Sequence, residues 1–328
     1  GLMTPLLTHF LYKYKLGKAI RSSDSAPVFF EHHKQKSGTP TMGGIIIWAT
    51  TLIIAVVIYY LARITKADLL IDLNFFSRAQ TLLPLGALIA AALVGLVDDF
   101  FNIRRIGPHG GGLRVRHKLL LYSAIALIGA WWFYFKLDWD LLHVPFVGSF
   151  EVGWWYIPIF FFIIVATSFS VNETDGLDGL AGGVLVTSFL SFGAIAFVQG
   201  KYDLATFCGA IIGALLAFLW FNIPPARFFM GDTGSMALGV TLGIIAMLTN
   251  TLFLLPIIGI VLVIESLSVI IQVLSKKIRK KKVFLSAPWH HHLEAKGWSE
   301  AKIVMRLWIV SSVFGLIGFV IYLLDKNV

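Results

Sequence analysis

Charged residues are scarce in this chain, and that scarcity excludes most classes of soluble protein. Asp, Glu, Lys and Arg make up 14% of the 328 residues, whereas hydrophobic residues make up 57%. A typical soluble domain carries about 25% charged residues, and the mean hydropathy here is +0.81. The single cysteine, Cys208, lies in an apolar run, which excludes a disulfide framework and a cysteine-ligated metal site.

Long apolar runs take the place of the missing charge. Runs that can cross ~30 Å of hydrocarbon as helices recur along the whole length. We therefore predict an all-α polytopic integral membrane bundle of about nine spans in a single transmembrane domain, residues 1–328. A short apolar piece before Lys13 fits neither a span nor a signal peptide, and we interpret it as part of a truncated first span. The predicted spans are 43–62, 82–98, 119–135, 154–171, 180–198, 204–221, 236–250, 252–275 and 304–324.

Basic residues are divided unevenly between the two sides of this bundle. Of the 27 Lys and Arg residues, 21 fall in one set of alternate loops and 6 in the other. The positive-inside rule places the richer set in the cytoplasm and the C-terminus outside. Topology thus explains the net charge of +9 without a nucleic-acid partner. The richer loops are 1–42, 99–118, 172–179, 222–235 and 276–306.

Two stretches predict local structure and have no expected role in a reaction. Residues 144–152 alternate around Gly148-Ser149, which predicts a short extracytoplasmic hairpin turning at that pair. Lys276 to Lys282 contains six basic residues in seven, which predicts the end of a long helix anchored at the inner membrane surface.

Paired carboxylates, Asp98 and Asp99, follow the apolar run 82–97. An ionised carboxylate within a bilayer costs several kcal/mol, so such residues usually face a cavity or mark a function. These two sit where the span should leave the hydrocarbon, and either end the helix or form a site. Other Asp residues recur at the same kind of boundary, which favours a site.

Two further acidic stretches lie on the same predicted side. Residues 172–180, Asn-Glu-Thr-Asp-Gly-Leu-Asp-Gly-Leu, form either a tight turn with a helix cap or a loop that closes around a polar ligand. Asp232, within Phe-Phe-Met-Gly-Asp-Thr-Gly-Ser at 228–235, precedes a new helix. It either caps that helix or holds Mg²⁺ against a phosphate at the helix N-terminus.

Three consecutive histidines, 290–292, complete the set. Helix neighbours point about 100° apart, so a shared metal is awkward, and hydrogen bonding to a diphosphate fits better. Oxygen ligands suit Mg²⁺ shared with substrate phosphates, so the pattern indicates a reaction between a soluble and a membrane-embedded phosphate compound. A transporter would place its acids mid-span, where we find little besides Glu265, which is either a buried bundle residue or part of the site.

Five stretches resemble, in order, the polyprenyl-phosphate N-acetylhexosamine-1-phosphate transferases. The Thr-Pro-Thr-Met-Gly-Gly and triple-His stretches are most similar to the phospho-N-acetylmuramoyl-pentapeptide branch. Each motif alone is weak, whereas five in order on one membrane face are specific. The stretches are 38–44, Asp98-Asp99, 172–180, 229–239 with Asn222, and 287–298.

The resemblance implies a catalytic domain with a cytoplasmic active-site cleft and a further N-terminal span. It implies transfer of phospho-MurNAc-pentapeptide from UDP-MurNAc-pentapeptide to undecaprenyl phosphate, with Mg²⁺, giving lipid I and UMP. A homodimer in the bacterial inner membrane is implied as well. The alternatives are a sister transferase for UDP-GlcNAc or UDP-GalNAc and, from another class, a transporter or flippase.

Matching positions implies individual roles. Asp98, Asp99, Asp232 and His291 are expected to be catalytic, with Asp232 as the Mg²⁺ ligand and Asp98 as the candidate base. The family's Lys after the paired Asp is Asn102 here, so Arg104 or Arg105 is expected to replace it. The expected substrate-binding residues are Lys36, Thr41, Arg116, Lys118, Asn172, Asp175, Gly176, Leu177, Asp178, Asn222, Phe229, His290 and His292.

Overall fold

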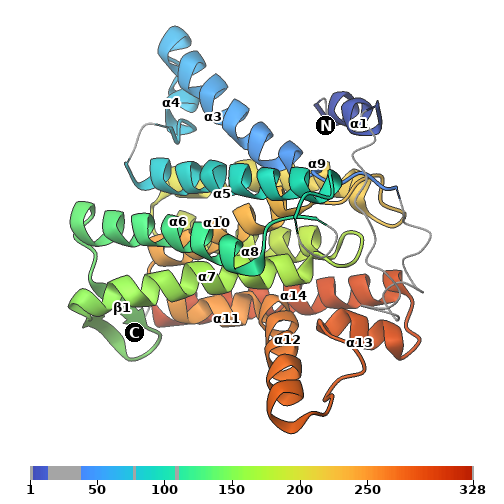
Figure 1. The fold of residues 1–328 in the computed structure, drawn as a ribbon. Coiled ribbons are helices and arrows are strands. Elements are labelled where there is room, and N and C mark those ends of the chain that lie inside the picture. Colours follow the sequence, from blue (N-terminus) through green and yellow to red (C-terminus); the bar gives the residue numbers. More distant parts are fainter. Residues whose placement is uncertain (1–2, 14–37, 77–78, 108–110, 327–328) are drawn as a thin grey trace.

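The computed structural model describes residues 3–13, 38–76, 79–107 and 111–326. It is a bundle of helices with one small hairpin at one end and the short helix α13 at the other (Figure 1). In chain order the elements are α1 (Met3–Lys13), α3 (Ile45–Thr65), α4 (Asp68–Asp72), α5 (Ala79–Ile103), α6 (Val115–Lys136), β1 (Leu141–Val144), β2 (Gly148–Glu151), η3 (Gly153–Trp155), α7 (Tyr156–Thr174), α8 (Leu180–Val198), α9 (Tyr202–Asn222), α10 (Asp232–Leu248), η4 (Leu252–Leu254), α11 (Leu255–Ile258), α12 (Ile260–Arg279), α13 (Trp289–Ala295) and α14 (Glu300–Asp325).

The predicted all-α polytopic membrane bundle is confirmed. Within the described part of the chain, seven helices are long and apolar enough to cross a membrane: α3, α5, α6, α7, α8, α9 and α14. Helices suit apolar sequence in lipid because they satisfy their backbone hydrogen bonds internally. The chain is therefore a multi-pass membrane protein.

Two predicted spans take other forms. The span predicted at 252–275 is broken at Gly259, where α12 turns by 83° from the preceding short helices. The span predicted at 236–250 is α10, which begins earlier, at Asp232, and is buried at every residue. It packs mainly between α5 and α7. Glycine makes this possible, because a Cβ on Gly239 would lie 2.6 Å from the backbone of Ser168.

The predicted hairpin is present, but its turn lies elsewhere. Strands β1 and β2 pair antiparallel, with Val144 opposite Gly148, so the turn occupies 145–147 and Gly148-Ser149 belongs to β2. The C-terminal end of α14 holds this turn in place. Asp325 accepts a hydrogen bond from the backbone N of Phe146 at 2.6 Å and contacts His143 Nε2 at 2.6 Å.

Candidate active site

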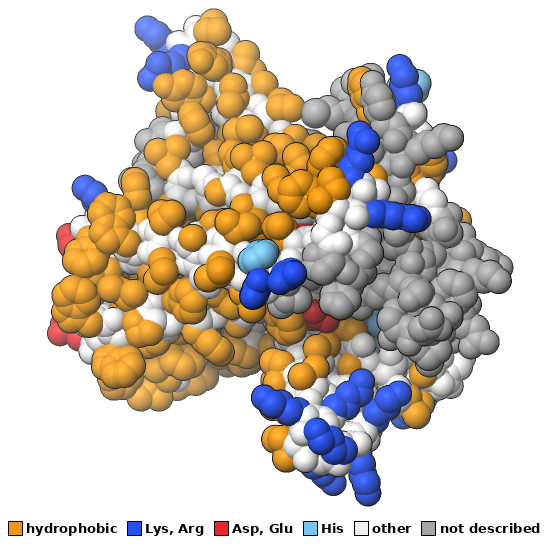
Figure 2. Space-filling model, in the orientation of Figure 1, with side chains coloured by type: hydrophobic (Ala, Val, Ile, Leu, Met, Phe, Trp, Pro, Cys, Tyr) orange, Lys and Arg blue, Asp and Glu red, His pale blue; other side chains and the backbone are white. Residues whose placement is uncertain are grey.

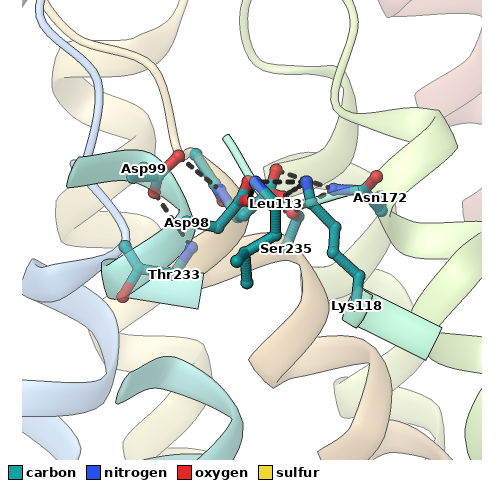
Figure 3. Close-up of polar contacts among 9 residues, drawn as sticks. Asp98, Asp99, Leu113, Lys118, Asn172, Thr233 and Ser235 are labelled. Carbon is teal, nitrogen blue, oxygen red and sulfur yellow. Dashed lines mark hydrogen bonds and ion pairs between the residues drawn. The ribbon is translucent and has the colours of Figure 1, made fainter. Parts of the chain in front are cut away.

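Four helices bring a charged cluster together (Figure 3). Asp98 lies near the end of α5, Lys118 near the start of α6, Asn172 near the end of α7, and Asp232 begins α10. Lys118 Nζ is 2.6 Å from Asp98 Oδ2 and 2.5 Å from Asp232 Oδ2. Asn172 Nδ2 donates to Asp232 Oδ1 at 3.0 Å and to Ser235 Oγ at 3.1 Å. Residues far apart in sequence thus converge on one bridging ammonium.

Lys118 supplies the positive charge of this cluster, and Arg104 and Arg105, which were expected to replace the family's Lys after the paired Asp, do not join it. Both arginines are exposed, and Arg104 lies over the Phe100 ring at 5.5 Å. Asp98 and Asp232 are only 3% and 7% exposed. The two buried carboxylates carry two negative charges, and Lys118 compensates one of them. An uncompensated buried charge is unfavourable, so this site attracts further positive charge.

Asp99 has different partners from its neighbour. It is 1% exposed, and its two carboxylate oxygens accept from the backbone N of Asp232 at 3.2 Å and of Thr233 at 3.1 Å. The first N–H groups of a helix lack partners within it, and a carboxylate satisfies and stabilises them. Asp99 therefore caps α10 and fixes the backbone from which Asp232 projects. Gly231, at φ 73°, permits this contact, since a Cβ there would lie 2.5 Å from Asp99 Oδ2.

The stretch 172–180 is braced against the segment 222–231. Asp178 Oδ2 accepts from Ala226 N at 3.0 Å. Asn222 Oδ1 accepts from Gly179 N at 3.0 Å, and its Nδ2 donates to Phe228 O at 2.8 Å. Asp178 and Asn222 thus hold backbone segments in place in this structure. Leu177 is buried beside them, and Asp175 is half-buried at the end of α7.

The stretch 38–44 reaches the same region through its backbone. Phe229 N donates to Pro40 O, and Gly43 N donates to Phe229 O, both at 2.8 Å. Thr41 is fully buried, and a Cβ on Gly231 would lie 2.7 Å from its Oγ1.

One predicted substrate-binding residue, Arg116, is not brought into this cluster. Its side chain is exposed and makes no hydrogen bond or ion pair within the described ranges. Lys36 lies outside the described residues.

The three histidines of α13 have separate partners. His290 is fully buried, and Glu265 Oε2 lies 2.9 Å from its Nδ1 and 3.2 Å from its backbone N. His291 Nδ1 is 2.6 Å from Glu294 Oε2, and His292 Nδ1 accepts from the backbone N of Leu285 at 3.1 Å. Among the described residues, no three His, Cys, Asp or Glu side chains are grouped to hold a metal ion.

Glu265 thus combines the two alternatives that its sequence position left open. It is fully buried in the bundle, and it orients a predicted site residue. The other ring nitrogen of His290, Nε2, lies against the 172–180 stretch. The approach is so close that a Cβ on Gly176 would lie 2.2 Å from this atom.

Glu265 also sets the charge of His290. Burial lowers the pKa of this imidazole, but the carboxylate of Glu265 and smaller contributions from Glu294 and Glu173 together outweigh burial and hold the pKa above its ordinary value. A raised folded-state pKa gives stability that is fully present below the unfolded-state pKa of about 6.5. That stability is lost as pH rises through the higher folded-state pKa.

We expect a matching pH dependence of thermal stability. The unfolding midpoint of the protein in detergent should fall as pH rises above about 6.5, and His290→Asn should lack this component. His117→Asn, at an exposed position of α6, should follow the unsubstituted protein. Parallel curves for the protein and His290→Asn would show that this pair contributes no pH-dependent stability.

Comparison with known families identifies the class of this site. The model of glycosyl transferase family 4 matches residues 81–250, the stretch that contains Asp98, Lys118, Asn172 and Asp232. Signature 1 of phospho-N-acetylmuramoyl-pentapeptide-transferase matches residues 36–47. The class is that of membrane transferases.

Individual relatives refine the assignment. The phospho-N-acetylmuramoyl-pentapeptide-transferase of Geobacillus thermodenitrificans is 40% identical, over 98% of this chain and 93% of its own length. Those of Chloroflexus aggregans and Clostridium novyi are each 38% identical, over 94% and 96% of this chain and 83% and 91% of their own lengths. The chain belongs to the phospho-N-acetylmuramoyl-pentapeptide-transferase family.

Proposed function

We propose that this protein transfers phospho-MurNAc-pentapeptide from UDP-MurNAc-pentapeptide to undecaprenyl phosphate, giving lipid I and UMP for peptidoglycan synthesis. Family membership over nearly the full chain supports the substrates. The observation that carries the reaction class is the Lys118 bridge between Asp98 and Asp232 at a helix N-terminus. That arrangement suits phosphate chemistry, which depends chiefly on positioning and charge stabilisation.

The two carboxylates of the bridge are proposed to have different tasks. Asp98 accepts a hydrogen bond from Leu113 N at 2.6 Å as well as the contact from Lys118, so it is held at one position. We propose that Asp98 acts as a general base and removes the last proton of the acceptor phosphate. Lys118 attracts the two anionic phosphates, and the unpartnered, buried Nε2 of His290 offers a further polar atom beside Gly176.

We propose that Asp232 holds Mg²⁺. The donor set fits this ion, because Mg²⁺ in enzymes is commonly held by one or two carboxylates plus substrate phosphates, and the Asp232 carboxylate already lies against a cationic group, the Lys118 ammonium. Bound there, the ion would neutralise negative charge on the diphosphate as UMP leaves. The chain's own part is to aim Asp232 through the cap from Asp99 and the hydrogen bond from Asn172.

We place the protein in the bacterial inner membrane, with the cluster facing the cytoplasm. The uneven distribution of Lys and Arg supports this orientation, since the loops at the cluster's end are the basic ones. We also propose a homodimer, following the family resemblance. Light scattering of the protein in detergent measures its mass, which distinguishes a homodimer from a monomer.

The decisive experiment measures UMP release by purified protein with undecaprenyl phosphate. We expect release with UDP-MurNAc-pentapeptide in the presence of Mg²⁺, and none when Mg²⁺ is chelated or when UDP-GlcNAc is the donor. Release with UDP-GlcNAc would assign the sister activity instead. Asp98→Asn tests the proposed base: turnover close to that of the unsubstituted protein would show that Asp98 is not the base.

Gly176 offers a steric test of the site. We expect Gly176→Ala to lower UMP release about 10²-fold, because its Cβ would collide with His290 Nε2 and displace a substrate-facing loop. Gly213→Ala in α9 is the matched control, since a Cβ there meets nothing within 4 Å. Equal activity of the two variants would show that the close contact between Gly176 and His290 is not needed for the reaction.

A further inference from the structure

The helix α12 and the chain that follows it form an arm, defined here as residues 260–288. The arm runs across the direction of the bundle helices and extends away from them (Figure 1). Beyond Leu262 the buried residues of α12 are all polar, and they include Ser268, Gln272 and Ser275. Gln272 Oε1 accepts from the backbone N of Val283 and Phe284 at 2.9 and 3.0 Å, and its Nε2 donates to Phe284 O at 2.8 Å. The returning chain thus satisfies the polar face of α12.

The outward face of the same helix is apolar. Exposed side chains at positions i, i+3, i+4, i+7 and i+11 form one stripe, since this spacing keeps residues on one side of a helix. The stripe consists of Leu267, Ile270, Ile271, Leu274 and Ile278, which are 43–75% exposed. A helix with polar residues inside and apolar residues outside is suited to acyl chains and not to water.

The tip of the arm is basic. Lys276, Lys277 and Arg279 to Lys282 are all exposed, and Figure 2 shows Lys and Arg side chains gathered over this tip. None of the six forms an ion pair within the described part of the chain. The sequence from 266 to 293 contains no Asp or Glu, so the field of the tip is uncompensated locally.

We propose that this tip binds anionic phospholipid headgroups, with the stripe among the acyl chains of the same leaflet. An apolar helix face that adjoins a Lys/Arg cluster is the pattern of interfacial membrane binding. Clustered basic residues beside a membrane attract anionic lipids, and lysine stems can lie along apolar surface while their ammonium groups reach the headgroups. An acidic protein partner would explain the charge but not the adjoining apolar stripe.

A label at the tip tests the proposal. Cys208 is fully buried, so Ile278→Cys creates one accessible thiol for a fluorophore. The labelled protein is reconstituted in phosphatidylcholine bilayers that contain a small fraction of phosphatidylglycerol or phosphatidylcholine carrying the same acyl-chain nitroxide quencher. We expect phosphatidylglycerol to be enriched about fivefold or more near the label at low salt. The enrichment should fall toward unity at high salt because exposed charges are screened.

Charge variants locate the effect. Lys280→Gln/Lys281→Gln/Lys282→Gln should at least halve the enrichment. The matched control Arg63→Gln/Lys66→Gln/Lys136→Gln, which removes three charges elsewhere, should leave it unchanged. Equal quenching by the two lipids in the label-only protein overturns the proposal whatever the variants do. Absence of quenching by either lipid overturns it as well and assigns the tip to water, where a soluble acidic partner would be sought.

Discussion

Lys118→Met should abolish most UMP release and also destabilise the fold. The substitution removes the ammonium that bridges Asp98 and Asp232 and leaves two buried carboxylates facing each other. Breaking a buried charge pair in this way costs about 3–5 kcal/mol. The loss of charge stabilisation should lower kcat by about 10²-fold or more. Thermal unfolding in detergent and UMP release measure the two effects on one preparation.

A double variant separates them. Lys118→Met with Asp98→Asn should recover stability, because one of the two repelling charges is gone, but it should not recover activity. Lys136→Met, at the exposed far end of the same helix, should change neither. A Lys118→Met protein of unaltered stability would mean that water or another cation already compensates the two carboxylates.

Asp232→Asn should lower activity strongly but change stability little. We expect kcat to fall about 10²–10³-fold, because the carboxylate proposed to hold Mg²⁺ loses its charge. Stability should change little: loss of the favourable contact with the helix N-terminus costs at most about 1 kcal/mol, and repulsion from Asp98 is relieved. Kinetics of UMP release at several Mg²⁺ concentrations, with an unfolding curve, provide the measurement.

The control for this substitution is Asp72→Asn, at the exposed end of α4, which should match the unsubstituted protein in both measurements. Near-normal turnover by Asp232→Asn would remove Asp232 from the proposed chemistry and leave the bridge at Lys118 as a structural feature.

The helical membrane fold was predictable because lipid imposes a simple rule on sequence. Apolar runs of sufficient length must be helices in a bilayer, and the helices α5, α8 and α14 lie close to the predicted ranges. Asp232 was also predictable as a helix start, since Gly231 and the following Thr and Gly mark a boundary. These inferences need only local sequence.

Contacts between distant segments were beyond that reasoning. Lys118 and Asp232 are 114 positions apart, and nothing in the local sequence distinguishes Lys118 from Arg104 as the partner of the paired Asp. Ser235 was within reach, because it lies three residues after Asp232 on one helix face. The bend before α12 also had a signal: Ser268, Gln272 and Ser275 fall on one side of a helix that was predicted to cross lipid.

Burial of α10 at every residue has a consequence for how the protein is made. Its main neighbours, α5 and α7, precede it in the chain, so the ribosome delivers them to the membrane first. A helix with no side toward lipid has to dock onto partners that are already inserted. Asp98, Lys118 and Asn172 are therefore synthesised before Asp232. The charged cluster can form only after α10 has been made and docked between its neighbours.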